Sequence, residues 1–340
     1  MTNLALKAPG RRFVIGLPYT WLIVFFLVPF LILLYISFVD MGNDISPFKP
    51  IWDSSTGLLH LKYENYWTIF RSVDESGQLF QTIYIEAYVR SIAYALATAM
   101  LCLLIGYPFS YFIARSPASV RPALLMMVML PFWTSFLLRV YAWKGILADQ
   151  GVINQVLMAL GLINDPIQML YTNVSMLVGM TYVYLPFMVL PLYANLVKMD
   201  FRLLEAAYDL GASPFKAFWL VTVPLSKAGI IAGFMLVFIP CVGEFVIPSL
   251  LGGPENIMIG RVVWDEMFTS NNWPRASALA VVMIGLIVVP LAIYYHYTGD
   301  AAEAHGNGRG LRAGRGLLAL ARRRLHHRRD ALRRRRGQAV

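Results

Sequence analysis

The sequence is poor in charged residues. Asp, Glu, Lys and Arg make up 14% of its 340 residues, about half the share found in a soluble globular domain, whereas hydrophobic residues make up 58%. This imbalance excludes a soluble enzyme. Cysteine is scarce as well, since only Cys102 and Cys241 occur and both lie inside apolar runs. They cannot form a disulfide framework, and we interpret them as small packed hydrophobic residues.

Nucleotide-binding and metal-binding motifs are missing too. The sequence contains no Gly-x-x-x-x-Gly-Lys-Ser/Thr segment and not even a Gly-Lys dipeptide, so the chain cannot cradle nucleotide phosphates by itself. The five histidines lack metal-ligand spacing, and His326 and His327 lie in an Arg-rich tail. We therefore predict no catalytic residue, no metal site and no cofactor bound by this chain.

The formal net charge of +10 belongs to the C-terminal tail. Residues 298–340 hold 12 of the 29 basic residues and 3 of the 19 acidic ones, so the preceding 297 residues carry a net charge of +1. The body of the protein therefore has no excess of basic residues for binding nucleic acid, and we predict no such partner. For the tail, which we expect to be disordered, two interpretations stay open: it binds anionic lipid headgroups, or it has no role.

Six apolar windows are long enough to cross a bilayer as helices, which takes about 20 residues. The first follows Arg11 and Arg12, as in a signal peptide, but its length and the lack of a small-residue cleavage site favour a retained anchor. We predict an all-α integral membrane protein with six transmembrane helices. The windows are residues 13–39, 91–114, 122–138 with a continuation toward Trp143, 174–197, 228–251 and 276–297.

The distribution of Lys and Arg predicts the orientation. With the N-terminus inside, the inner segments 1–12, 115–121 and 198–227 hold nine basic residues in 49 positions. The outer segments 40–90, 139–173 and 252–275 hold eight in 110 positions. We therefore expect a cytoplasmic N-terminus at 1–12, a six-span domain at 13–297 and a cytoplasmic tail at 298–340.

The inner segment 198–227 has the pattern of two short helices. Asp200 is a good N-cap, and Gly211 stands where a left-handed residue is needed to end a helix. Ser213 then caps a second helix with Pro214 at its first position, and we expect Pro224 to end it. Both a partner protein and the lipid headgroups remain open as the surface that covers the apolar faces. These faces contain Leu204, Ala207 and Tyr208 on the first helix and Phe215, Phe218 and Trp219 on the second.

The same segment carries a recognisable motif. Glu205-Ala206-Ala207 is followed after three residues by Gly211 and after nine more by Val221-Thr222-Val223-Pro224. This pattern resembles the EAA motif in the membrane subunits of bacterial ATP-binding cassette (ABC) importers, with Val at two positions where that family often has Ile and Leu. In that family the segment is the coupling helix, which docks in a groove of the ATPase subunit. The resemblance implies ATPase-coupling roles for Glu205, Ala206, Ala207, Gly211 and Pro224.

Four further stretches resemble the spermidine and putrescine permeases, especially the first membrane subunit of the putrescine type. The resemblance covers residues 12–297 and ends where the Arg-rich tail begins. It implies the MetI-like permease fold of type I ABC importers and a location in the bacterial inner membrane. The four stretches are residues 103–108, 131–143, 151–154 and 243–253.

The resemblance also implies partners. A second permease subunit, two ATPase subunits and a periplasmic polyamine-binding protein would complete the importer in the lipid bilayer. ATP and Mg would then be bound by the ATPase subunits. The outer loop 40–90 holds seven acidic residues and is the natural landing surface for such a receptor.

Glu244 is the only acidic residue within the six windows. Because a charge in the bilayer is unfavourable, we expect it to face the bundle, either on the path of a cationic substrate or as the cap of a broken helix. Asp265 and Glu266 guide cations or form a solvated face. Tyr141 and Trp143 offer cation-binding rings or anchor the helix at the interface.

The sequence thus predicts a non-enzymatic permease subunit of an ABC importer for polyamines, putrescine or spermidine. One alternative is an ABC permease for another solute such as sulfate or iron, because the coupling motif is shared among them. The other is a self-sufficient secondary transporter, which would show an inverted internal repeat that we do not see.

Overall fold

The computed structural model of the chain describes residues 10–43, 46–52, 61–70, 72–73, 79–80, 83–288 and 291–292. The predicted tail at 298–340 and the predicted N-terminal segment up to residue 9 lie outside the described residues. The chain divides into two compact units, residues 1–283 and 284–340. The described part is mainly helical, which confirms the predicted fold class.

The elements of the described residues follow the order below in the chain. The helices are α1 (Gly10–Leu22), η1 (Ile23–Leu27), α2 (Val28–Ile36), α3 (Glu64–Phe70), α4 (Ile83–Arg115), α5 (Arg121–Met129), η2 (Leu130–Trp133), α6 (Phe136–Leu147), α7 (Val152–Ala159), α8 (Asn173–Leu196), α9 (Arg202–Asp209), α10 (Pro214–Ala217), η3 (Phe218–Thr222), α11 (Val223–Leu225), α12 (Lys227–Val242), α13 (Val246–Leu251), α14 (Ile259–Trp264) and η4 (Asp265–Thr269), and an apolar helix at Trp273–Val288. The strands are β1 (Met41–Asn43), β2 (Ser46–Phe48), β3 (Ser72–Val73) and β4 (Leu79–Phe80), paired antiparallel as β1 with β2 and β3 with β4.

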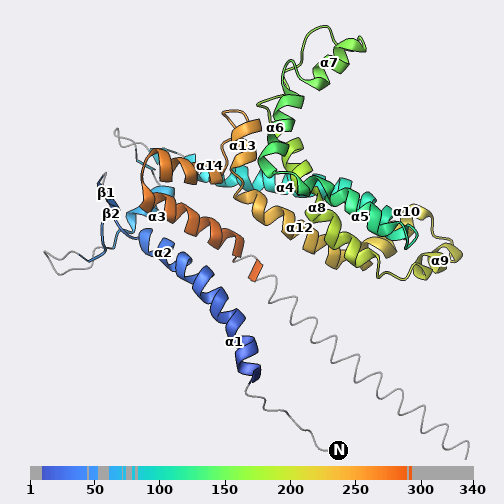
Figure 1. Cartoon of the computed structure of the whole chain (residues 1–340), viewed down its shortest axis with the longest axis horizontal. Coiled ribbons are helices and arrows are strands. Elements are labelled where there is room, and N and C mark those ends of the chain that lie inside the picture. The colour runs from blue at the N-terminus through green and yellow to red at the C-terminus, as the bar shows by residue number, and fades with distance from the viewer. Residues whose placement is uncertain are drawn as a thin grey trace, which may run out of the picture. The chain divides into compact units, whose positions relative to one another are not determined.

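Helices α4, α8 and α12 pack against one another and form the core (Figure 1). Glycines allow this close approach. A Cβ atom on Gly106 of α4 would lie 3.1 Å from Cγ of Met188 in α8, and one on Gly233 of α12 would lie 2.8 Å from Sδ of the same Met188. Small residues at such contacts hold membrane helices together by close packing, because lipid provides no hydrophobic drive for helices to associate.

Three helices are long and apolar enough to cross a membrane: Val14–Ile36, Ile83–Arg115 and Asn173–Leu196. Two bent pairs qualify if each counts as one span. They are Arg121–Trp133 with Phe136–Ala159, bent by 87°, and Pro214–Leu225 with Lys227–Val242, bent by 69°. The sixth predicted window falls on the shorter helix Trp273–Val288. The described residues thus give three to five spans, and six spans remain a prediction.

Two predicted boundaries are wrong. The window 91–114 belongs to a helix that begins at Ile83, so the expected outer loop 40–90 includes the first turns of α4. The window 228–251 is not one helix, because α12 ends at Val242 and α13 starts at Val246. Hydropathy alone detects neither point, since a helix can extend beyond the apolar run and can break inside it.

The first long helix has little support from the rest of the chain. Between Val14 and Ile36, only Ile36 is buried. Phe26 and Leu17 are 76% exposed, and the same surface continues through Trp21 and Phe25. This apolar surface is available to lipid or to another subunit.

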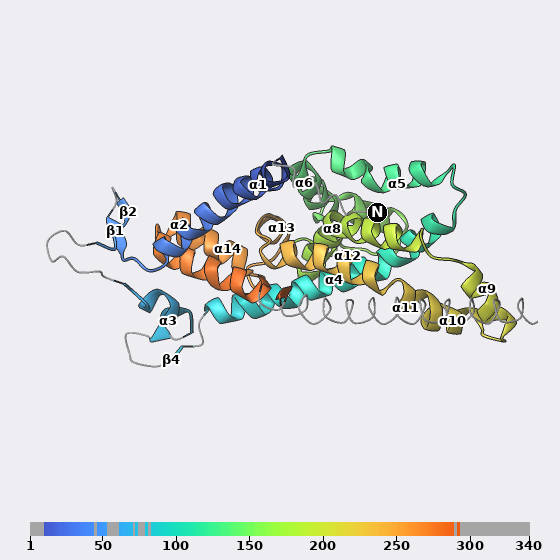
Figure 2. The ribbon, with the colours of Figure 1, turned by 90° about the horizontal axis from the view of Figure 1, so that it is seen from below.

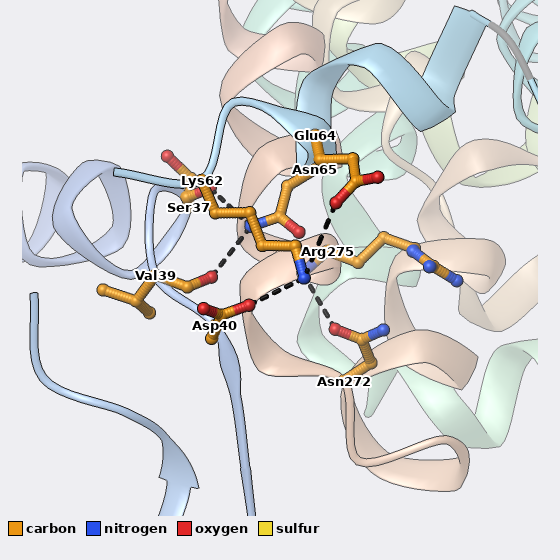
Figure 3. Close-up of polar contacts among 8 residues, drawn as sticks. All are labelled: Ser37, Val39, Asp40, Lys62, Glu64, Asn65, Asn272 and Arg275. Atoms are coloured by element: carbon orange, nitrogen blue, oxygen red, sulfur yellow. Dashed lines mark hydrogen bonds and ion pairs between the residues drawn. The ribbon is translucent and has the colours of Figure 1, made fainter. Parts of the chain in front are cut away.

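The β1–β2 hairpin and α3 lie at one end of the core bundle, and α9 and α10 lie at the other (Figures 1 and 2). At the first end, polar residues gather around Lys62 (Figure 3). The Nζ atom of Lys62 lies 2.7 Å from a carboxylate oxygen of Asp40 and 3.8 Å from one of Glu64. Asn272 and Arg275 lie beside it and, with Lys62 and Glu64, line a cavity of about 320 Å³. We call these five residues the Lys62 cluster.

Contacts next to the Lys62 cluster fix the chain that follows α2. The side-chain amide of Asn65 donates to the carbonyl oxygens of Ser37 at 3.0 Å and Val39 at 2.9 Å. Within the cluster, the hydrogen bond to Asp40 raises the pKa of the Lys62 ammonium, because it stabilises the charged form. The chain after α2, helix α3 and the start of helix Trp273–Val288 are thus held together by charge and hydrogen bonding.

Candidate coupling segment and substrate path

The segment 198–227, which we call the EAA segment, starts with helix α9. The backbone N–H of Arg202 donates to the side chain of Asp200 at 3.1 Å, as the capping pattern predicts. Gly211 has a φ of +83°, which confirms the left-handed turn. The N–H of Gly211 donates to the carbonyl of Tyr208 at 2.8 Å, so the turn closes the end of the helix.

The second half of the EAA segment differs from the prediction at one point. The Ser213 hydroxyl accepts from the N–H of Lys216 at 3.4 Å, which confirms the predicted cap. Pro224, however, does not end the helix, because η3 and α11 carry it on to Leu225. Pro224 stands in the first turn of α11, where its missing N–H is not needed. The chain bends by 69° only after that turn, at Ser226.

The EAA segment presents both its motif and apolar side chains to the outside. Glu205, Ala206, Gly211 and Pro224 are exposed, and Ala207 is half-buried. An isolated helix pair gains nothing from exposing large apolar residues, so this face is complementary to another surface. The largest exposed apolar side chains are Leu210 at 88%, Phe215 at 73%, Leu220 at 73% and Trp219 at 53%.

Aromatic rings and one buried hydrogen bond connect the EAA segment with α4. The hydroxyls of Tyr107 in α4 and Ser226 at the bend lie 2.7 Å apart, and both residues are buried. The ring of Phe218 stands edge-on to Tyr107, with centroids 5.4 Å apart. Tyr111 contacts Phe201 and Phe218 in the same manner. A displacement of the EAA segment therefore acts directly on α4.

Sequence reasoning did not identify the Tyr107 to Ser226 contact. The two residues are 119 positions apart, and no local pattern pairs them. The available signal was a tyrosine within an apolar helix, whose hydroxyl needs a partner when it is buried.

Glu244 lies in the break between α12 and α13 and is 8% exposed. One carboxylate oxygen accepts from the N–H groups of Val246 at 3.0 Å and Ile247 at 3.4 Å. The other accepts from the hydroxyl of Tyr184 in α8. The structure thus shows the helix-capping interpretation of Glu244 and adds Tyr184, which the sequence did not reveal. A carboxylate has about four acceptor positions, so one stays free for a further donor.

The other four candidate path residues fall into two groups. Asp265 lies 3.6 Å from the Arg261 guanidinium, and Glu266 accepts from the hydroxyl of Tyr84 at 2.5 Å. Both follow Trp264, whose ring stacks on Phe245 at 4.8 Å, one residue after Glu244.

Tyr141 and Trp143 form the second group, on α6. This helix follows the 87° bend and packs against α13 and α8. Tyr141 is 54% exposed, and the Trp143 ring contacts Tyr182 of α8 at 5.4 Å. No contact between these two rings and Glu244 is present among the residues that the structure describes. In the same part of the chain, no three His, Cys, Asp or Glu side chains gather as metal ligands.

Comparison with known proteins gives consistent results. Residues 105–299 match the family described as binding-protein-dependent transport system inner membrane component. The chain is 35% identical over 285 residues to the spermidine/putrescine transport system permease protein PotB of Haemophilus influenzae, which covers 84% of this chain and 93% of that protein.

Solved structures share the fold. A bacterial ABC transporter involved in the import of the acidic polysaccharide alginate matches with a TM-score of 0.57 at 17% identity, covering 85% of this chain and 96% of that one. A bacterial alginate ABC transporter in complex with an alginate pentasaccharide-bound periplasmic protein matches with a TM-score of 0.56 at 18% identity, covering 86% and 96%.

These matches confirm the predicted ABC importer permease fold and the predicted non-enzymatic role. They also place the protein in the inner membrane, as its apolar helices predict. The chain belongs to the family of binding-protein-dependent transport system inner membrane components.

Proposed function

We propose that the solutes carried by this permease subunit are polyamines, putrescine or spermidine. The observation that carries the proposal is the similarity to PotB of Haemophilus influenzae, which extends over 93% of that protein. A buried carboxylate between two spans is consistent with a cationic solute, because an ammonium that loses its water needs such a group or an aromatic face.

We further propose the composition of the importer. This chain forms the translocation path together with a second permease subunit, two ATPase subunits bind ATP and Mg, and a periplasmic polyamine-binding protein delivers the solute. The family name and the alginate transporter solved with its periplasmic protein support such an assembly. The Lys and Arg distribution supports an orientation with both termini and the EAA segment on the cytoplasmic side.

In this scheme the exposed face of the EAA segment docks on an ATPase subunit. Glu205 supplies a carboxylate for a charge-assisted hydrogen bond, and Gly211 allows the turn that places both helices. Nucleotide binding then favours one arrangement of α4 and α12 over another, and alternating access follows. This requires that the permease bind differently in the two nucleotide states, since equal binding would shift no equilibrium.

Uptake of radiolabelled putrescine, spermidine and sulfate by a deletion strain that carries this chain tests the solute. We expect uptake of at least one polyamine and none of sulfate. Sulfate uptake would replace the solute while keeping the importer class. Transport by the isolated chain in proteoliposomes would instead reveal a self-sufficient transporter.

Glu205→Ala and Gly211→Pro test the docking. We expect both variants to lose ATP-dependent uptake while the binding protein still associates with the assembly. Pro at position 211 cannot adopt the observed φ of +83°. Coupling at the wild-type level in both variants would refute the docking role of this segment.

Glu244→Gln tests the substrate path. A Gln keeps the size of the side chain and an oxygen for the N–H groups of α13, but removes the negative charge. We expect a higher KM for putrescine uptake with normal amounts of the assembled importer. Unchanged putrescine kinetics would leave Glu244 with the capping role alone.

A further inference from the structure

A second cavity lies beside the bend at Ser226. It has a volume of about 400 Å³ and is lined by residues of α4, such as Met100 and Leu104, and by residues on both sides of the bend, such as Trp219, Val223 and Ile230. Its size falls within the range of about 300 to 1,000 Å³ that is common for small-molecule sites. Every residue of its lining is apolar or aromatic.

The cavity opens away from the core of the bundle. Leu104 is 72% exposed, Met100 57% and Trp219 53%, although α4 is one of the helices long enough to span the membrane. The floor includes Tyr107 and Phe218, which connect the EAA segment with α4. An occupant would therefore touch the joint between the EAA segment and the membrane helices.

The charges around the cavity are all positive. From Met100 to its end, α4 carries a single charged residue, Arg115, and residues 214–242 carry only Lys216 and Lys227. Arg115 follows Tyr107 by eight residues and lies on the same face of α4. Lys227 precedes Ile230 by three residues, on the same face of α12. The side chains of all three basic residues are exposed.

A cavity with apolar walls and basic residues at one end matches the chemistry of an anionic phospholipid. The acyl chain fits between apolar walls, and basic residues near the membrane surface attract anionic headgroups. Tryptophan at the boundary is typical of the headgroup region. A helix from another subunit would fill the apolar part equally well, but it would leave the three cations unexplained.

We propose that this cavity binds one acyl chain of an anionic phospholipid, with the lipid phosphate held by Arg115, Lys216 and Lys227. The site is separate from Glu244 and from the exposed face of the EAA segment. It requires only the membrane location of the chain, so it does not depend on the solute.

Quenching of tryptophan fluorescence by brominated lipid tests the proposal. Trp219 is kept as the sole tryptophan of the chain, with the other seven changed to Phe, and the detergent-purified importer assembly is titrated with brominated phosphatidylglycerol. The same assembly with tryptophan-free partner subunits provides the optical window. We expect saturable quenching of Trp219 at a low mole fraction of lipid, and weaker quenching by brominated phosphatidylcholine.

A matched control uses Trp133 as the sole tryptophan, because this residue is 79% exposed and lies outside the cavity. We expect its quenching to rise without saturation and to be the same for both lipids. Lys227→Gln in the Trp219 background should shift half-quenching by phosphatidylglycerol upward about fivefold, the ratio that corresponds to about 1 kcal/mol per basic residue. Quenching by phosphatidylcholine should not change.

Two results would overturn the proposal. Equal and non-saturable quenching of Trp219 by both lipids would show contact with bulk lipid only. No quenching of Trp219 would show that another subunit covers the cavity. Leu104→Phe, which narrows the cavity without removing a charge, provides an independent variant: it should weaken the saturable quenching of Trp219 and leave that of Trp133 unchanged.

Discussion

The two ends of the α4–α8–α12 bundle are held by different kinds of contact. At the end of the Lys62 cluster, hydroxyls and amides of α4 bond to distant segments: Tyr88 donates to the carbonyl of Leu279 at 2.6 Å, and Ser91 accepts from the N–H of Ile259 at 2.7 Å. At the end of the EAA segment, aromatic rings provide most of the contacts, and large apolar side chains stay exposed. The first end is organised within one chain, whereas the second leaves a surface for a partner.

The largest effect is expected at the exposed end. Leu210→Asp places a charge where an 88% exposed apolar side chain stands. If this face docks on an ATPase subunit, the substitution should weaken that binding by at least about 2 kcal/mol, roughly thirtyfold. The amount of ATPase that co-purifies with the chain measures the effect.

Leu162→Asp is the matched control for Leu210→Asp. Leu162 is 68% exposed but lies after α7, outside the EAA segment. It should leave ATPase binding unchanged, and neither variant should lower the unfolding temperature. Equal loss of ATPase with both variants would argue against a specific surface on the EAA segment.

A smaller effect compares one tyrosine at each end of α4. Tyr88→Phe and Tyr107→Phe each remove one buried hydroxyl, which should reduce the free energy of unfolding by about 0.5 to 1.5 kcal/mol in both cases. Only Tyr107→Phe should also raise the number of ATP molecules consumed per solute imported, because Tyr107 contacts the bend at Ser226. Equal coupling in the two variants would assign Tyr107 a purely stabilising role.

The smallest effect concerns Lys62. Because its pKa is raised above the usual 10.5 in the folded protein, its ion pairs stabilise the fold below that pH and lose their effect as the pH rises through the folded pKa. The Lys62 side chain is 37% exposed, so solvent screening limits the contribution to under about 1 kcal/mol. Thermal unfolding between pH 8 and about pH 11 should therefore show a slightly steeper alkaline decline in the wild type than in Lys62→Met. Identical declines would show that the cluster contributes nothing through charge.

Local sequence patterns predicted local structure well. The left-handed turn at Gly211 and the cap at Ser213 depend on residues within a few positions of one another, so their chemistry is visible in the sequence. Pro224 is the exception, because a proline is equally compatible with the first turn of a new helix and with the end of an old one.

Long-range pairs were beyond prediction. Tyr184 and Glu244 are 60 residues apart, and Lys62 and Arg275 come together only through packing of the elements that carry them. The 87° bend near Thr134 and Ser135 was missed for a related reason. Hydropathy records how apolar a segment is, whereas the direction of its axis depends on neighbours that a single window does not contain.

The isolated position of helix Val14–Ile36 has a consequence for biogenesis. A segment with one buried residue gains almost nothing from tertiary packing, so its stability must come from partitioning into lipid as an autonomous hydrophobic rod. Such a segment can leave the translocon and settle in the bilayer before α4, α8 and α12 have been synthesised. It then acts as a tether that keeps the growing polypeptide at the membrane until the rest of the bundle assembles.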